Sequence, residues 1–302
     1  MFENILGNER NKKILEKTIE LNKTSHSYIF WGTEGIGKKI IAEEFAKKIL
    51  CIEKTRDNCT CKSCIEFDSK NNPDFQLIEP IEGKVKIEQI REMQRKVAEK
   101  PIISNKKVYI IENSDTMTTE AQNCLLKTLE EPPEYITIIL ICSNENNLLS
   151  TIKSRCTRMY FEPIPDEEVK KYINKNYPEQ SINENILSLF QGSIGKAIKL
   201  KEHQELYEGI ENILTNLQTK DLIDIVQMSE EIYKSKEEIY SVLEYMNVLL
   251  LKLSKDNINY IKCIEIVEET KKRLKANSNY DMCIDNLIFN IWRKINEKNN
   301  RS

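Results

Sequence analysis

Short apolar runs alternate with amphipathic stretches over about the first 160 residues of the chain. The apolar runs predict five strands, at residues 28–31, 75–78, 108–111, 136–141 and 158–161. Between them lie stretches such as 87–97 and 119–129, whose apolar residues recur at helical spacing. Because short strands that alternate with helices are typical of a parallel sheet covered by helices, the pattern predicts an α/β domain.

The pattern changes after Pro163 and Pro165, where strand signals stop and an acidic segment begins a predicted helix. A small helical segment follows, and then longer helices, each with one apolar face, continue to a polar tail. We therefore expect three parts, which are an α/β domain at 1–163, a small helical domain at 164–203 and an all-helical domain at 204–302.

Composition agrees with a helix-rich soluble protein of two or three domains. The 302 residues are 40% hydrophobic and 31% charged, and the formal net charge is only −3. These values exclude a disordered chain and a strongly basic nucleic-acid binder. No apolar run approaches the roughly 20 residues that span a bilayer, and the first ten residues carry charges where a signal peptide is apolar. We expect a cytoplasmic protein with no membrane partner.

A phosphate-binding pattern follows the first predicted strand and precedes a predicted helix. Gly32, Gly35, Gly37 and Lys38 match the sequence G-x-x-x-x-G-K, in which backbone amides turn toward an anion and the lysine contacts phosphate. Lys39 replaces the Ser or Thr that holds Mg²⁺, and an ammonium has no lone pair for a metal. ATP or ADP binding stays open, beside the alternative that the glycines only maintain a tight turn. Metal-assisted hydrolysis is not expected.

A second catalytic part is missing after the predicted strand at 108–111. A P-loop ATPase places there an Asp for the Mg²⁺ shell and a Glu that orients the attacking water, but this chain has Glu112 and Asn113. Because an amide cannot accept a proton at neutral pH, no general base stands at that position. Two independent motifs therefore predict a protein without useful ATPase activity.

A cluster of four cysteines lies in the polar segment after the phosphate-loop helix. Cys51, Cys59, Cys61 and Cys64 fall within fourteen residues. Four thiolates suit tetrahedral Zn²⁺, and the binding energy, on the order of 10 kcal/mol, is enough to order such a segment. The alternative is a redox pair, but the segment lacks the aromatic flank and helix start of a reactive Cys-x-x-Cys.

Nearby positive charges and the remaining cysteines also bear on this interpretation. Positive charges that offset a four-thiolate site are nearby, on Lys54, Arg56 and Lys62. The remaining cysteines stand in apolar or helical context and are expected to be small core residues, namely Cys124, Cys142, Cys156, Cys263 and Cys283.

Several separated motifs occur in an order that resembles one known family. These are TTEAQNCLLKTLEEPP at 118–133, Ser-Arg-Cys at 154–156, Gly-Ser at 192–193, His-Ser-Tyr at 26–28 and the cysteine cluster. Together they resemble the AAA+ subunits of bacterial replicative clamp loaders, which belong to the DNA polymerase III holoenzyme. The resemblance implies an AAA+ domain, a helical lid at 164–203 and a helical collar at 204–302 through which subunits assemble.

Within that family the chain resembles the non-motor delta prime subunit. A third ATPase part is absent, because Gly195 stands where the family has a sensor arginine, with Lys196 as a partial substitute. The zinc spacing also differs, since one residue instead of two separates Cys59 and Cys61. The alternative is an ATP-hydrolysing motor subunit of the gamma/tau type.

The resemblance also implies a role for Arg155. In the family this arginine reaches the ATP of a neighbouring subunit, and a guanidinium is planar, permanently charged and able to hold two oxygens. Without the flanking motif it would be an ordinary surface arginine. The implied partners are gamma/tau and delta subunits, with the sliding clamp and primed DNA contacted through the complex. On the helix of the 118–133 motif we expect Gln122, Lys127 and Glu130 to be exposed toward a partner.

Overall fold

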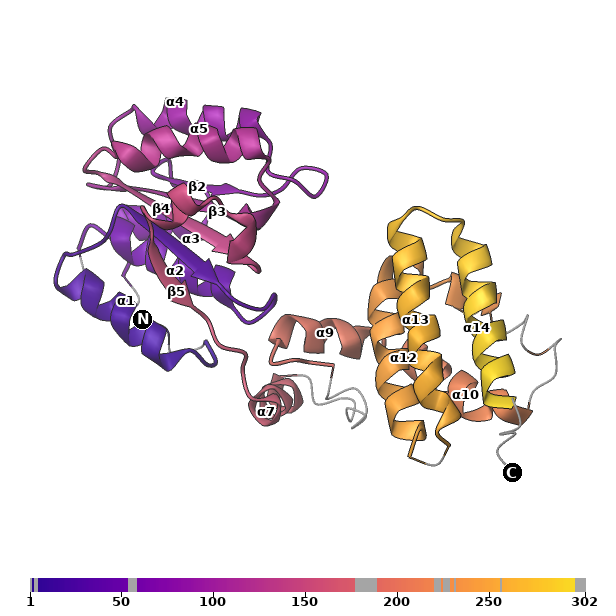
Figure 1. Cartoon of the computed structure of the whole chain (residues 1–302). Coiled ribbons are helices and arrows are strands. Elements are labelled where there is room, and N and C mark those ends of the chain that lie inside the picture. The colour runs from indigo at the N-terminus through magenta and orange to yellow at the C-terminus, as the bar shows by residue number, and fades with distance from the viewer. Residues whose placement is uncertain are drawn as a thin grey trace. The chain divides into compact units, whose positions relative to one another are not determined.

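The chain forms two compact units, the first comprising residues 1–165 and 192–195 and the second residues 166–191 and 196–302 (Figure 1). The computed structural model describes residues 2, 5–53, 59–176, 189–219, 224, 229–230, 232–255 and 257–296. The predicted charges of Lys54 and Arg56 and the end of the polar tail lie outside the described residues. The division into three domains at 163 and 203 stays a prediction.

The first unit is built on a parallel five-stranded sheet in the order β2-β3-β4-β1-β5. Its strands are β1 (Ser27–Trp31), β2 (Phe75–Ile78), β3 (Lys107–Ile111), β4 (Ile136–Cys142) and β5 (Thr157–Tyr160). Every residue of β3 and β4 is buried, as expected where helices cover both faces of a sheet. The α/β prediction is therefore confirmed, with each strand end within one residue of its predicted position.

Helices cover both faces of this sheet (Figure 1). One face carries α1 (Glu9–Glu20), α2 (Lys38–Leu50) and the short α3 (Lys62–Asp68), and the other carries α4 (Ile87–Val97) and α5 (Thr119–Glu130). Because successive side chains of a strand point to opposite faces, Val108 and Ile110 pack with α1 and α2, whereas Tyr109 and Ile111 pack with α4 and α5. The apolar residues of β3 therefore belong to two separate cores, one on each face of the sheet.

The order of the strands decides where functional groups meet. Since all five strands are parallel, the segments that follow β1, β2, β3 and β4 emerge at the same edge of the sheet. The loop after β1 enters α2, and the loop after β3 forms the short 3-10 helix η1 (Ser114–Thr116). The connection from β4 to β5 contains the 3-10 helix η2 (Glu145–Asn147) and α6 (Ser150–Lys153).

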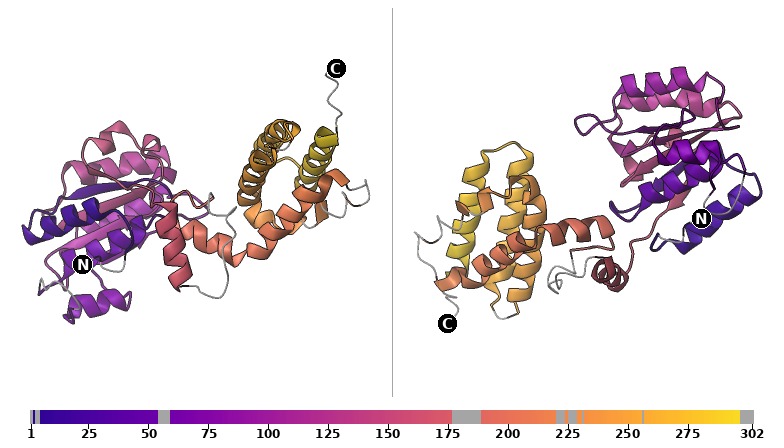
Figure 2. Two further views of the ribbon diagram at one scale, coloured as in Figure 1. Left: turned by 90° about the horizontal axis from the view of Figure 1, so that it is seen from below. Right: turned by 180° about the vertical axis from the view of Figure 1, so that it is seen from behind.

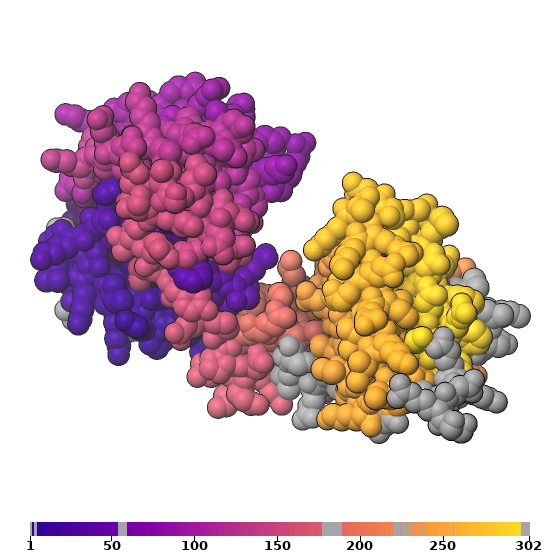
Figure 3. Space-filling view, in the orientation of Figure 1, coloured from indigo at the N-terminus to yellow at the C-terminus, as the bar shows by residue number. Residues whose placement is uncertain are grey.

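The described residues of the second unit form helices joined by turns, with no strand. This unit contains α7 (Asp166–Asn176), most of α9 (Ile194–Glu202), α10 (Gln204–Asn216), η3 (Leu217–Thr219), η4 (Lys236–Glu238), α12 (Ile239–Leu253), α13 (Asn259–Lys275) and α14 (Tyr280–Asn296). Two further views show α12, α13 and α14 side by side (Figure 2). The space-filling view, in the orientation of Figure 1, shows that atoms fill the spaces that the ribbons leave open within each unit (Figure 3). The rings of Tyr207 on α10 and Tyr245 on α12 meet edge to face, with centroids 5.1 Å apart. The predicted all-α C-terminal region is confirmed.

A buried carboxylate fixes the loop that supports α3. Asp74 is 2% exposed and accepts the backbone amides of Ile102, Ile103 and Ser104 at 2.7, 2.8 and 2.7 Å. The hydroxyl of Ser104 in turn donates to the carbonyl of Leu50 at 2.6 Å and lies 2.9 Å from the hydroxyl of Ser63 on α3. One carboxylate therefore connects β2 with the ends of α2 and α3.

Replacing Asp74 with alanine will lower the free energy of unfolding of the first unit by about 3 to 5 kcal/mol. The change leaves three backbone amides without their charged acceptor in a buried position. Urea denaturation measures the loss, and Glu134→Ala, which removes an exposed carboxylate before β4, is the control that leaves stability unchanged. Equal stability of the two variants would show that water replaces the Asp74 carboxylate at no cost.

Candidate functional site

The phosphate-loop pattern forms a turn between β1 and α2. Gly35 and Gly37 have φ values of +75° and +90°, in the left-handed region that favours glycine, and Gly37 is the N-cap of α2. The Lys38 side chain is 6% exposed, and its Nζ donates to the carbonyls of Gly32 and Thr33 at 2.6 and 2.7 Å. The four residues expected to bind phosphate thus lie in one loop, and the lysine contacts the carbonyls of that loop.

Burial disfavours the charged form of the Lys38 side chain. It lowers the pKa of the Lys38 ammonium, and the nearby Cys142, Glu34 and Asp115 offset only part of that effect. The loop carbonyls supply the acceptors that the buried ammonium needs. An incoming phosphate would have to compete with these acceptors for Nζ.

A distant segment of the chain packs against the same loop. The amide of Gly195 donates to the carbonyl of Gly35 at 3.0 Å, and a Cβ atom on Gly35 would lie 2.2 Å from the hydroxyl of Ser193, which is fully buried. Gly195, where the sequence resemblance predicts that a sensor arginine is missing, therefore contacts the loop through its backbone. Lys196 donates to Gln191 at 3.0 Å.

Lys39 ends in a cluster of carboxylates at the edge of the sheet. Its Nζ lies 2.6 Å from Oε2 of Glu112, which follows β3, and 2.8 Å from Oε1 of Glu79, which follows β2. Burial lowers the pKa of Lys39, but its hydrogen bonds with Glu112 and Glu79 outweigh burial and raise the pKa overall. The hydrogen bond from Lys39 lowers the pKa of Glu79. Lys39, which stands where the phosphate-loop pattern has a metal-binding Ser or Thr, is therefore a cation held by two carboxylates.

Sequence reasoning missed two acidic residues at this edge. Glu79 is separated from the other members of its cluster by at least 33 residues, and the only available signal was an acidic side chain directly after a predicted strand. Asp115 accepts the backbone amides of Ser143 and Asn144 at 3.2 and 3.0 Å. Its carboxylate therefore fixes the start of the loop after β4.

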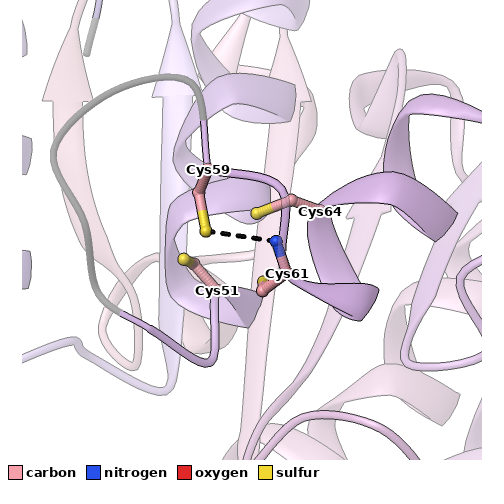
Figure 4. Close-up of side chains that lie close together, drawn as sticks. All are labelled: Cys51, Cys59, Cys61 and Cys64. Carbon is pink, nitrogen blue, oxygen red and sulfur yellow. Dashed lines mark hydrogen bonds between the residues drawn. The ribbon is translucent and has the colours of Figure 1, made fainter.

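The four clustered cysteines converge from the ends of two helices (Figure 4). Cys51 caps the end of α2, Cys61 is the N-cap of α3, Cys64 lies in the first turn of α3, and Cys59 lies in the segment just before Cys61. All four sulfur atoms lie within 4.8 Å of one another. A tetrahedral site with Zn–S bonds of about 2.3 Å has sulfurs about 3.8 Å apart, so a small inward movement suffices. The cluster fits a metal ion, and the one-residue spacing between Cys59 and Cys61 does not prevent convergence.

Hydrogen bonding and burial have opposite effects on the pKa of Cys61 but act in the same direction on the pKa of Cys64. The amide of Cys61 donates to Sγ of Cys59 at 3.4 Å. Burial raises the pKa of the Cys61 thiol, but hydrogen bonds with backbone amides and neighbouring thiols lower it to about 6. Burial and hydrogen bonds with the thiols of Cys61 and Cys51 raise the pKa of Cys64. A thiolate is therefore favoured at Cys61 and disfavoured at Cys64 when no metal is bound.

The other cysteines lie outside this cluster. Cys142, Cys263 and Cys283 are buried, as predicted for small core residues, whereas Cys124 and Cys156 are only partly buried. The Cys124 thiol donates to Oε1 of Gln94 on α4 at 3.1 Å.

Arg155 lies between α6 and β5 on the surface of the first unit. Its backbone carbonyl accepts the hydroxyl of Ser27 at 2.8 Å, which fixes the chain at this point. Its side chain is 33% exposed; one guanidinium nitrogen donates to the carbonyl of Thr151 at 2.9 Å and the other lies 2.8 Å from Oε1 of Glu130. The guanidinium is thus held beside the end of α5, within reach of solvent.

The expectation that Gln122 faces a partner was wrong. Gln122 is 5% exposed, its amide donates to the carbonyl of Asn147 at 3.0 Å, and its Oε1 accepts the amide of Leu149 at 2.8 Å. The spacing of apolar residues along α5 predicts which side chains face the sheet. It does not predict that Gln122 faces the loop at 147–149. Lys127 and Glu130 are exposed, as predicted.

The fold and the site together define an α/β P-loop protein of the AAA+ class with an all-helical C-terminal region. The sequence model of the family described as DNA polymerase III, delta subunit, matches residues 7–165, just over half of the chain. The chain therefore belongs to this family. Among the described residues, no helix combines the length and the apolar character that crossing a bilayer requires.

Curated relatives agree with this assignment, and a solved structure shares the fold. The chain is 34% identical over 203 residues to DNA polymerase III subunit delta' of Bacillus subtilis and 30% identical over 240 residues to subunit tau/gamma of Haemophilus influenzae. These matches cover 66% and 74% of this chain, which spans only 60% and 35% of the lengths of those relatives. A gamma subunit-related protein of Thermotoga maritima has the same fold, with a TM-score of 0.52, 18% identity and coverage of 93% of this chain and 99% of that one.

Proposed function

We propose that this chain is the delta prime subunit of a replicative clamp loader. In this role it completes the loader ring as a non-motor subunit and supplies Arg155 in trans to the ATP site of a neighbouring ATPase subunit during sliding-clamp loading. The observation that carries the proposal is the placement of Arg155, whose guanidinium lies on the surface of the first unit, paired with Glu130 and with a third of its side chain exposed. Lys39 stands at the position of a metal ligand, where it is ion-paired with Glu79 and Glu112.

The phosphate loop supports a non-motor role. Hydrolysis needs a metal ligand after Lys38, a base to orient water and a cation at the sensor position. This chain has an ammonium at Lys39, an amide at Asn113 and no side chain at Gly195. The Lys38 ammonium is held by carbonyls of its own loop. Each departure affects a different part of the reaction, so one substitution would not restore it.

A second candidate function is an ATP-hydrolysing motor subunit, like the gamma/tau relatives. The backbone of the loop favours it, because Gly35 and Gly37 keep the left-handed conformations that turn amides toward a phosphate. Nucleotide binding without turnover is compatible with both functions. Turnover by the isolated chain separates them.

The isolated chain will hydrolyse ATP no faster than its Lys38→Ala variant, and both will remain at the background of the assay. The reason is the absence of a metal ligand, a base and a sensor cation, each of which supports the transferring phosphoryl group. A coupled assay with saturating Mg²⁺ and ATP measures the rate. A steady rate that Lys38→Ala abolishes would contradict the proposal and favour the motor function.

Partners follow from the same proposal. We expect gamma/tau and delta subunits as ring neighbours, with the sliding clamp and primed DNA reached through the assembled complex in the cytoplasm. The net charge of −3 favours shared contacts with DNA over autonomous binding. In this arrangement residues 164–203 serve as the lid and residues 204–302 as the collar that joins subunits.

The cysteine cluster holds one structural Zn²⁺ in this proposal. Cys51, Cys59, Cys61 and Cys64 supply four sulfur ligands, which leaves no open position for catalysis. The ion would tie the end of α2 to the start of α3. Three of the four cysteines are at most 6% exposed, in keeping with a structural site.

A further inference from the structure

The guanidinium of Arg155 is held by acceptors from two separate elements of the first unit. One terminal nitrogen donates to the carbonyl of Thr151 on α6 at 2.9 Å and lies 3.4 Å from the hydroxyl of Ser154. The other terminal nitrogen lies 2.8 Å from Oε1 of Glu130, the last residue of α5. Because the two nitrogens are held from two elements, these contacts fix both the place and the plane of the guanidinium.

Glu130 stands where a carboxylate is unfavourable without a cation. The C-terminal end of a helix is the negative end of its dipole and favours cations in the last turn. Glu130 is the last residue of α5, and the exposed Glu131 adds a second negative charge directly after it. The guanidinium of Arg155 offsets this charge. The arginine partner therefore explains the position of Glu130, whereas the helix alone does not.

These contacts leave part of the guanidinium available for a ligand. An arginine side chain has five N–H donors and no acceptor. Within the part of the chain that the structure describes, Thr151, Ser154 and Glu130 engage three of these donors. Two donors therefore remain for the oxygens of a phosphoryl group, so Arg155 can bind such a group while Glu130 stays in place.

We propose that Glu130 is a positioning residue that orients Arg155 for the ATP site of the neighbouring subunit. This inference rests on the proposed function and deepens it, because it names the residue that holds the guanidinium. A free arginine side chain samples many rotamers, whereas an anchored one spends more time in the geometry that stabilises a transferring phosphoryl group. An exposed ion pair contributes little to folding, so the effect falls on the rate and not on stability.

The test measures ATP turnover in an assembled loader in which only the ATPase site next to this chain is active. Glu130→Ala is expected to lower the maximal rate roughly tenfold, because Arg155 loses an anchor, while KM for ATP changes by less than about twofold. KM is retained because the nucleotide is bound mainly by the neighbouring subunit. Glu130→Gln, which keeps an acceptor oxygen at the same reach, is expected to restore most of the rate.

Three comparisons separate positioning from a general effect of charge. Glu131→Ala removes the same charge one residue further along and is expected to leave the rate unchanged. In a chain that already carries Arg155→Ala, Glu130→Ala is expected to have no further effect, because a residue that acts through Arg155 loses its effect with it. In the isolated chain, NMR relaxation of the Arg155 side-chain nitrogen reports its order, which Glu130→Ala but not Glu131→Ala is expected to lower.

Several results would overturn the positioning role while leaving the proposed function intact. If Arg155→Ala lowers turnover but Glu130→Ala behaves like Glu131→Ala, or if Arg155 is equally ordered without Glu130, the carboxylate does not orient the guanidinium. A rate that rises with Glu130→Ala would show that Glu130 holds Arg155 away from the phosphate. A further loss in the Arg155→Ala background would show that Glu130 acts independently. Unchanged turnover with Arg155→Ala is a different outcome, since it contradicts the proposed function itself.

Discussion

Replacing Arg155 with alanine will lower ATP turnover at the neighbouring subunit's site by roughly 10³-fold or more in an assembled loader. A guanidinium that contacts the transferring phosphoryl group stabilises charge that develops only in the transition state, so its loss lowers the rate more than it weakens nucleotide binding. Arg155→Lys will recover only part of the rate, because an ammonium cannot hold two oxygens in a planar geometry. Assembly will persist, since the Arg155 side chain is 33% exposed and has no part in the core.

The measurement requires a loader in which only the ATPase site next to this chain is active. Loaders are assembled from purified subunits in which the phosphate-loop lysines of the other ATPase sites have been replaced, and DNA-stimulated turnover is followed with native chain and with Arg155→Ala. Arg158→Ala is the matched control, since it removes a nearby guanidinium on β5 that is 49% exposed and pairs with Glu145. Equal turnover with Arg155→Ala and Arg158→Ala would show that Arg155 is an ordinary surface residue.

Loss of the proposed Zn²⁺ will destabilise the segment from the end of α2 through α3 by on the order of 5 kcal/mol or more. Replacing Cys61 and Cys64 together with serine removes half of the ligands and leaves polar hydroxyls at two positions that are 6% and 2% exposed. Because thiolates bind the metal, zinc affinity will also fall as the pH is lowered and protons compete for sulfur. A strong chelator will act in the same direction on the native chain.

Elemental analysis and melting curves test this prediction together. The native chain is expected to carry about one zinc per molecule, and the double cysteine variant none. Cys124→Ser is the matched control, because this thiol is partly buried but lies outside the cluster, and it will keep both the zinc and most of the stability. A native chain that is folded, free of metal and as stable after chelation would exclude the zinc site.

The sequence by itself determined the local elements and the cysteine cluster. Strand β2 and helix α4 have the bounds that apolar periodicity predicted, because the burial of one face sets a period of two or 3.6 within a few neighbouring residues. The four cysteines were recognised for a similar reason. All lie within fourteen residues, so one local reversal of the chain can bring them together whatever the order of the strands.

Only the tertiary structure decided which distant residues meet. The contacts of Lys39 with Glu79 and Glu112 join residues 40 and 73 positions apart, and they depend on β2 and β3 being neighbours in a parallel sheet. No local pattern specifies strand order, because each strand only needs some covered place in the sheet. The burial of Gln122, the contact of Gly195 with Gly35 and the pairing of Arg155 with Glu130 have the same origin, since each depends on how separate elements pack.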